Sequence, residues 1–129
     1  MKVLIKSRND IEIMASKPFE QKTALISIAD YDWDFAELKY NPDYILQLAF
    51  DDVDNDVFKD ELGREPTNDE RISIEHKYHM MTDKQANQIT EFYKNICNKV
   101  DVLICQCEHG QSRSAAVAAA ILEYGCKKG

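Results

Sequence analysis

The sequence is poor in the two residues that most often interrupt regular structure. Of its 129 residues, 4 are glycine and 3 are proline. This scarcity excludes a collagen-like or Pro/Gly-rich disordered chain. Long apolar runs are also missing, since the longest covers residues 115–122, whereas crossing a bilayer takes roughly 20 residues. The first ten residues lack the apolar stretch of a signal peptide. We therefore expect a cytoplasmic protein without a membrane partner.

Positive charge is scarce as well. The chain has 16 Lys and Arg against 23 Asp and Glu, a net charge of −7, so it offers no basic surface to a nucleic acid. Many of the carboxylates lie between residues 51 and 70, and such a run is typical of a solvated face. In a cytoplasmic protein the four cysteines, at 97, 105, 107 and 126, are expected to be free thiols that serve catalysis or metal binding.

Short apolar segments alternate with segments of helical periodicity. Strands are predicted over 2–6 (KVLIK), 23–29 (TALISIA), 44–50 (YILQLAF) and 102–106 (VLICQ). Helices are predicted from residue 9 or 10 to about 16, from Thr82 to about Val100, and over 114–124 with Gly125 as a C-cap. Thr82 and Gln85 have the spacing of a capping box. This alternation predicts one α/β domain, residues 1–129, around a mostly parallel sheet.

The most informative segment is the loop between the last strand and the last helix. Cys107 ends an apolar strand and stands six residues before Arg113, which opens a helix. Backbone N–H groups in such a loop and the positive end of the helix suit a dianion, and the same field lowers the pKa of a cysteine thiol. Gly110 allows a tight curl of the backbone. Arg113 offers a planar fork to two phosphate oxygens, and Ser114 can donate a hydrogen bond to the sulfur.

These residues resemble the signature of the cysteine-dependent protein tyrosine phosphatases, Cys-x5-Arg followed by Ser or Thr. The ending Gly-x-Ser-Arg-Ser, at 110–114, is most similar to the small dual-specificity branch and its bacterial relatives. The order of strands and helices over residues 23–124 also resembles this family. One departure is Gln106, which stands where the family usually has a histidine.

The resemblance implies a phosphatase-like catalytic domain that is short or truncated at its C-terminus. It would hydrolyse phosphotyrosine, and phosphoserine or phosphothreonine, through a phosphocysteine, and would need no metal or cofactor. The substrate would be a phosphorylated protein or a small phosphoester. The catalytic residues would be Cys107, Arg113, Asp52 and Ser114, and the phosphate would be held by Glu108, His109, Gly110, Gln111, Ser112 and Arg113.

Two other functions fit the same residues. A phosphate-binding pseudophosphatase would keep the loop without turnover. A zinc site would use Cys105, Cys107 and His109 with the pair His76 and His79, although a continuous strand seldom gives three converging ligands. Zinc content and turnover of an aryl phosphate separate these three functions.

The general acid is predicted from strand periodicity. Leu46, Leu48 and Phe50 alternate on one face of a strand, and the next residue in that phase is Asp52. The family's pattern selects the same residue, while a bulge at the strand end would favour Asp51 instead.

We expect Asp52→Asn to lower turnover by roughly 10²-fold or more on substrates with poor leaving groups, because the leaving oxygen then receives no proton. The basic limb of the pH–rate profile should disappear as well. Asp51→Asn is the matched variant and should change little; the reverse pattern would assign the acid to Asp51.

Overall fold

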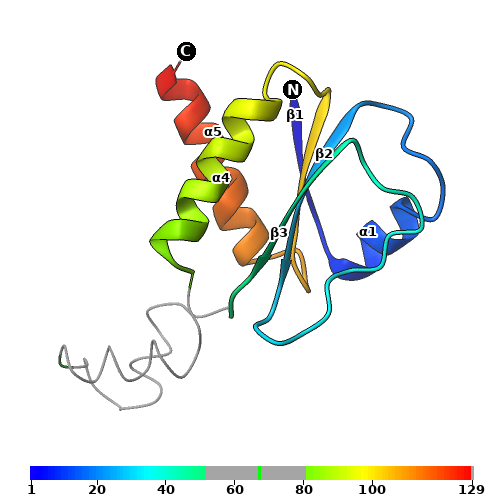
Figure 1. Ribbon diagram of the computed structural model, residues 1–129, viewed down its shortest axis with the longest axis horizontal. Helices are drawn as coiled ribbons and strands as arrows, with labels where there is room; N and C mark the ends of the chain where they lie inside the picture. The colour runs from blue at the N-terminus through cyan, green and yellow to red at the C-terminus, as the bar shows by residue number, and fades with distance from the viewer. Residues whose placement is uncertain (52–66, 68–80, 129) are drawn as a thin grey trace.

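The computed structural model describes residues 1–51, 67 and 81–128, and Figure 1 shows this part of the chain as a sheet between two layers of helices. In chain order the elements are β1 (Lys2–Lys6), α1 (Arg8–Met14), β2 (Thr23–Ala29), β3 (Tyr44–Ala49), α4 (Asp83–Ile96), β4 (Val102–Gln106) and α5 (Arg113–Lys128). The four strands lie in the order β1-β4-β2-β3, and every pairing is parallel. The predicted α/β fold with a parallel sheet is confirmed at this level.

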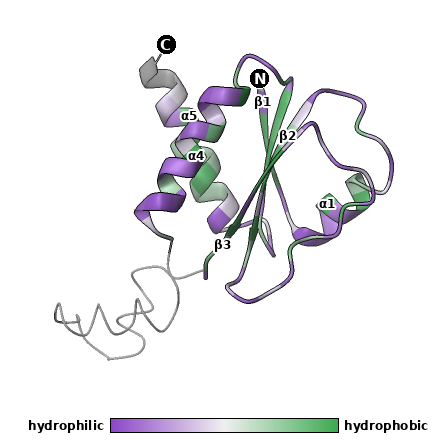
Figure 2. Cartoon of the chain, in the orientation of Figure 1, coloured by the Kyte–Doolittle hydropathy of each residue, from purple (hydrophilic) through white to green (hydrophobic). Residues whose placement is uncertain are grey.

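Apolar residues cover both faces of the sheet. On one face, Ile26 and Leu48 pack in a cluster with Ile96 of α4 and Ile121 of α5. On the other face, a second cluster joins Leu25 and Ile104 to Ile11 of α1. Every residue of β2 and β4 is buried, as expected of parallel strands covered on both sides. Figure 2 shows these strands in the green of hydrophobic residues, whereas α4 carries bands of purple.

The helix ends test the predicted boundaries. The capping box is confirmed, since the Gln85 N–H donates to Thr82 Oγ1 over 3.1 Å and the Thr82 N–H donates to Gln85 Oε1 over 3.0 Å. Helix α1 begins earlier than predicted, because the Ser7 side chain caps it by accepting the N–H of Asp10. Strand β3 ends one residue early, at Ala49.

The prediction of Gly125 as a C-cap is wrong. Helix α5 continues through Gly125 to Lys128. A Cβ at Gly125 would lie 2.8 Å from the hydroxyl oxygen of Tyr93, so the absence of a side chain there lets α4 and α5 approach each other closely.

The short helix and turn predicted between residues 54 and 81 fall on 52–66 and 68–80, which lie outside the described residues. In the described part of the chain, no helix has the length and apolarity needed to cross a membrane.

The connections that follow the neighbouring strands β1 and β4 leave the sheet toward opposite faces. Strand β1 runs into α1 on one face, and its neighbour β4 runs into α5 on the other face (Figure 1). Where adjacent parallel strands diverge in this way, a crevice forms at their carboxyl ends, and ligands of open α/β sheets bind in such crevices. The loop that begins at Cys107 leaves β4 at this point.

The packing of helix α1 against the sheet is expected to depend mainly on one side chain. Ile11 is the residue of α1 that is fully buried, whereas Ile13 on the same helix is 62% exposed. We expect Ile11→Ala to lower the free energy of unfolding by about 2–5 kcal/mol, because it leaves a cavity beneath the sheet. The matched variant Ile13→Ala should change it by less than about 0.5 kcal/mol. Urea unfolding measures both, and equal effects would contradict the packing of α1.

Candidate active site

Cys107 directly follows the last residue of β4, at the carboxyl end of that strand. Its backbone N–H donates to the carbonyl of Lys6 over 3.3 Å, which extends the pairing of β4 with β1 by one residue. The residue is 2% exposed, and its Sγ lies 3.1 Å from Oγ of Ser114, the second residue of α5. The predicted contact between Ser114 and the sulfur is therefore present.

The surroundings of Cys107 favour its thiolate. Burial by itself raises the pKa of the Cys107 thiol. Hydrogen bonds from the Ser114 side chain and from the backbone of Ser114, Gly110 and Gln111 act in the opposite direction, and together they lower the pKa below its ordinary value. These donors stabilise a negative charge at one point, so they suit a thiolate or an anion placed beside it.

Cys105 has the opposite environment. It belongs to the same buried cluster as Cys107, two residues earlier on β4. Burial raises the pKa of its thiol to about 12, and Cys105 is therefore a protonated side chain of the core at neutral pH. The contrast singles out Cys107 as the reactive member of the pair.

The curl of the predicted phosphate loop, residues 107–113, depends on Gly110. This residue has a φ of +68°, a conformation that L side chains seldom adopt. A Cβ would lie 2.7 Å from the backbone nitrogen of Ser7 and 2.9 Å from the carbonyl carbon of Lys6. At Gly110 the loop thus packs directly against the backbone of the β1–α1 turn, residues 6–8, without room for a side chain.

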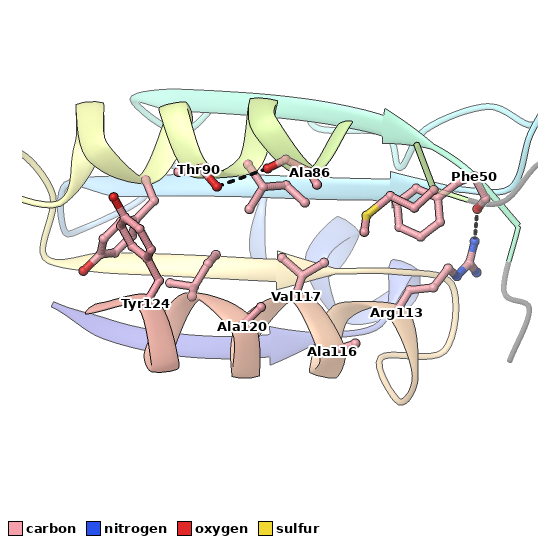
Figure 3. Close-up of a pocket in the computed structure, with 12 residues that line it drawn as sticks. Phe50, Ala86, Thr90, Arg113, Ala116, Val117, Ala120 and Tyr124 are labelled. Carbon is pink, nitrogen blue, oxygen red and sulfur yellow. Dashed lines mark hydrogen bonds between the residues drawn. The ribbon is translucent and has the colours of Figure 1, made fainter. Parts of the chain in front are cut away.

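Arg113 is the first residue of α5, and its side chain points toward Phe50, as Figure 3 shows. Its guanidinium Nη1 donates to Oδ1 of Asp30 over 2.7 Å and to the carbonyl of Phe50 over 2.9 Å. The side chain is 6% exposed, and its Nε is a buried donor without a partner. The N–H bond of Nε and one N–H bond of Nη2 lie in the guanidinium plane and point to the same edge of the group. Asp30 and Phe50 hold the group by Nη1, which leaves this edge for a ligand.

The remaining predicted residues take different positions. The Glu108 side chain accepts a hydrogen bond from Arg8 over 2.7 Å, and residues 109, 111 and 112 are exposed. Contacts from these residues to a phosphate would therefore be made by their backbone N–H groups. Asp51 is half-buried, and its Oδ1 accepts the N–H of Tyr31.

Asp52 lies outside the described residues, so its role stays a prediction. The alternation behind that prediction holds as far as Phe50. Leu48 and Phe50 pack in the same cluster as Cys107, and Leu46 packs against it.

Asp30 and Arg8 are two residues of the site that the sequence analysis missed. Asp30 directly follows β2, and the rule that carboxyl ends of parallel strands share one edge could have found it. The pairing of Arg8 with Glu108 joins residues 100 positions apart, and no local pattern in the sequence indicates it.

An apolar groove adjoins the site between α4 and α5. It has a volume of about 250 Å³ and extends from Arg113 and Phe50 to Tyr93 and Tyr124 (Figure 3). None of residues 107–112 lines it. The groove is therefore a neighbour of the phosphate loop rather than its binding pocket.

The proposed zinc ligands do not come together in the part of the chain that can be described. Cys105 and Cys107 are buried, whereas His109 is exposed. Among the described residues no group of three His, Cys, Asp or Glu side chains is arranged to hold a metal ion. His76 and His79 lie outside them.

Comparisons of this chain with protein families, with curated proteins and with solved structures find no match.

The two pKa directions predict selective alkylation of the native protein. Because the pKa of Cys107 is lowered, its alkylation rate should level off below the pH at which ordinary thiols do. Cys105, with a pKa of about 12, should stay protonated and unmodified until the protein unfolds. Peptide mapping after iodoacetamide treatment between pH 6 and about 9 measures both, with half-buried Cys97 as the reference thiol. Equal labelling of Cys105 and Cys107 at pH 7 would contradict the assignment.

Proposed function

We propose that this chain is a cysteine-dependent phosphomonoester hydrolase with a protein tyrosine phosphatase-like fold of the small dual-specificity type, which acts in the cytoplasm on phosphorylated proteins. The observation that carries this proposal is the unpartnered, buried Nε of Arg113, at the end of the loop that begins with Cys107, a buried thiol of lowered pKa. A buried donor without an acceptor is costly and rare. An oxyanion bound in the phosphate loop would satisfy it.

The reaction begins with the attack of the Cys107 thiolate on phosphorus. The S–P bond forms as the bond to the ester oxygen breaks, and Asp52 gives its proton to that oxygen. The equatorial oxygens accept hydrogen bonds from the loop N–H groups and from Nε and Nη2 of Arg113. Since Asp30 and the Phe50 carbonyl already fix the guanidinium, little reorganisation is needed as charge develops.

The second step is hydrolysis of the phosphocysteine. Asp52, now ionised, removes a proton from water, which attacks phosphorus and displaces the Cys107 sulfur. The Ser114 hydroxyl, 3.1 Å from that sulfur, stabilises the departing thiolate. Inorganic phosphate and the free thiolate result. The chemistry suits phosphotyrosine and also phosphoserine or phosphothreonine.

This function is tested by turnover of p-nitrophenyl phosphate and of phosphotyrosine and phosphothreonine peptides. We expect the wild-type chain to hydrolyse them in the presence of a chelator. Cys107→Ser and Arg113→Met should each lower kcat by roughly 10³-fold or more, because one removes the nucleophile and the other the fork that holds the phosphoryl group. Cys107→Ser should still bind inorganic phosphate.

Cys97→Ser is the matched control. Cys97 is half-buried at the end of α4, and its thiol donates to the Lys94 carbonyl over 3.6 Å, away from the loop 107–113 in the sequence, so its loss should leave kcat unchanged. Phosphate binding without turnover in the wild type would identify a pseudophosphatase instead. Loss of wild-type turnover to the chelator would contradict a metal-independent reaction.

A further inference from the structure

The phosphate loop is braced from outside by Arg8, the first residue of α1. The Arg8 Nε donates to Oε2 of Glu108 over 2.7 Å, and its backbone N–H donates to the Glu108 carbonyl over 3.1 Å. The same guanidinium donates to the carbonyl of Asp34 and lies 3.9 Å from the carboxylate of Glu12. One side chain thus joins the phosphate loop, α1 and the loop that follows β2.

The backbone contact fixes the direction of one amide group. In a trans peptide the carbonyl and the following N–H point in opposite directions, and the described residues include no cis peptide bond. Because the Glu108 carbonyl points to Arg8, the N–H of His109 points away from the β1–α1 turn. Together with the Cys107 N–H that donates to Lys6, this contact fixes the first half of the loop.

The side-chain contact has an electrostatic consequence. Glu108 directly follows the nucleophile, and a free carboxylate at that position would repel both a thiolate and a phosphate dianion. Its side chain is 35% exposed and that of Arg8 is 21% exposed, so water does not fully screen either charge. The ion pair neutralises Glu108 and turns its carboxylate toward α1.

We propose that Arg8 is a positioning residue of the phosphate site, which acts through Glu108 to keep a carboxylate away from the bound anion and to hold the loop open for it. This inference rests on the proposed function, since it takes the anion to be the phosphoryl group of the substrate. Arg8 has no direct contact with the reacting atoms in this role.

The test is the affinity for inorganic phosphate, measured by calorimetry on the full chain together with KM and kcat for p-nitrophenyl phosphate. Arg8→Gln should weaken phosphate binding and raise KM by about tenfold, which corresponds to the loss of one charge-assisted hydrogen bond. Its effect on kcat should be smaller. Glu108→Gln should tighten phosphate binding by about two- to threefold, because it removes a negative charge.

The double variant Arg8→Gln/Glu108→Gln separates the electrostatic role from a merely structural one. It should restore phosphate affinity to within about threefold of the wild type, since no carboxylate then remains unpaired. Arg8→Lys keeps the charge without the fork and should lie between Arg8→Gln and the wild type. Lys94→Gln removes a cation from the exposed pair with Glu91 on α4 and is the control.

Several outcomes overturn the inference. Unchanged phosphate affinity in Arg8→Gln contradicts it directly, and so does a double variant that binds no better than Arg8→Gln. If Arg8→Gln fails to fold, Arg8→Lys and Glu108→Gln still decide, because wild-type affinity in both would exclude the electrostatic role. A wild-type chain that neither binds phosphate nor hydrolyses the ester would instead refute the proposed function together with this inference.

Discussion

The loop 107–113 and the start of α5 direct the backbone N–H groups of Gly110, Gln111 and Ser114 to the sulfur of Cys107, and donors that face one another without a negative charge between them repel. Neighbours must therefore hold this loop from outside. The position of β4 between β1 and β2 supplies them on both sides. Lys6, Ser7 and Arg8 contact the first half of the loop, and Asp30 holds the arginine that ends it. A strand at the edge of the sheet would have offered support on one side only.

The chain as a whole is acidic, and the two arginines of the site are both paired with carboxylates. A net charge of −7 disfavours the approach of an anion. Each arginine of the site is also paired with a carboxylate, Arg113 with Asp30 and Arg8 with Glu108. The attraction of the proposed site for a phosphate would therefore depend on oriented dipoles, namely the backbone N–H groups of the loop and the start of α5, in addition to the fork of Arg113. Such dipoles act at short range, which favours a ligand that fits the loop closely over any polyanion.

Gln106 is a buried polar residue that links two neighbouring strands of the sheet. Its side chain is buried and accepts a hydrogen bond from the hydroxyl of Ser27 over 2.6 Å, across the β2–β4 pairing. It lies between Cys105 and Cys107 in the sequence and so points to the opposite face of the sheet. A buried amide that is paired in this way ties β4 to β2 directly below the nucleophile. The thiolate itself is stabilised by the loop and by Ser114.

The sequence by itself determined the local elements and the candidate residues of the loop. Short apolar, β-branched runs such as TALISIA and VLICQ favour strands buried on both faces, and the pair Thr82 and Gln85 marks the start of α4, because these patterns act within a few residues. The sequence also singled out Cys107, Gly110, Arg113 and Ser114. The prediction for Gly125 was wrong because a glycine that ends a helix and a glycine that makes room for a neighbouring tyrosine have the same local sequence pattern.

Only the tertiary structure decided what surrounds the loop. The order of the strands places Asp30 against Arg113 and Arg8 against Glu108, and both pairs join residues that lie far apart in the chain. It also separates the two neighbouring thiols, since the pKa of Cys105 is raised by burial while that of Cys107 is lowered by hydrogen bonds. These properties depend on distance and solvent exclusion between segments, and a one-dimensional pattern does not contain them.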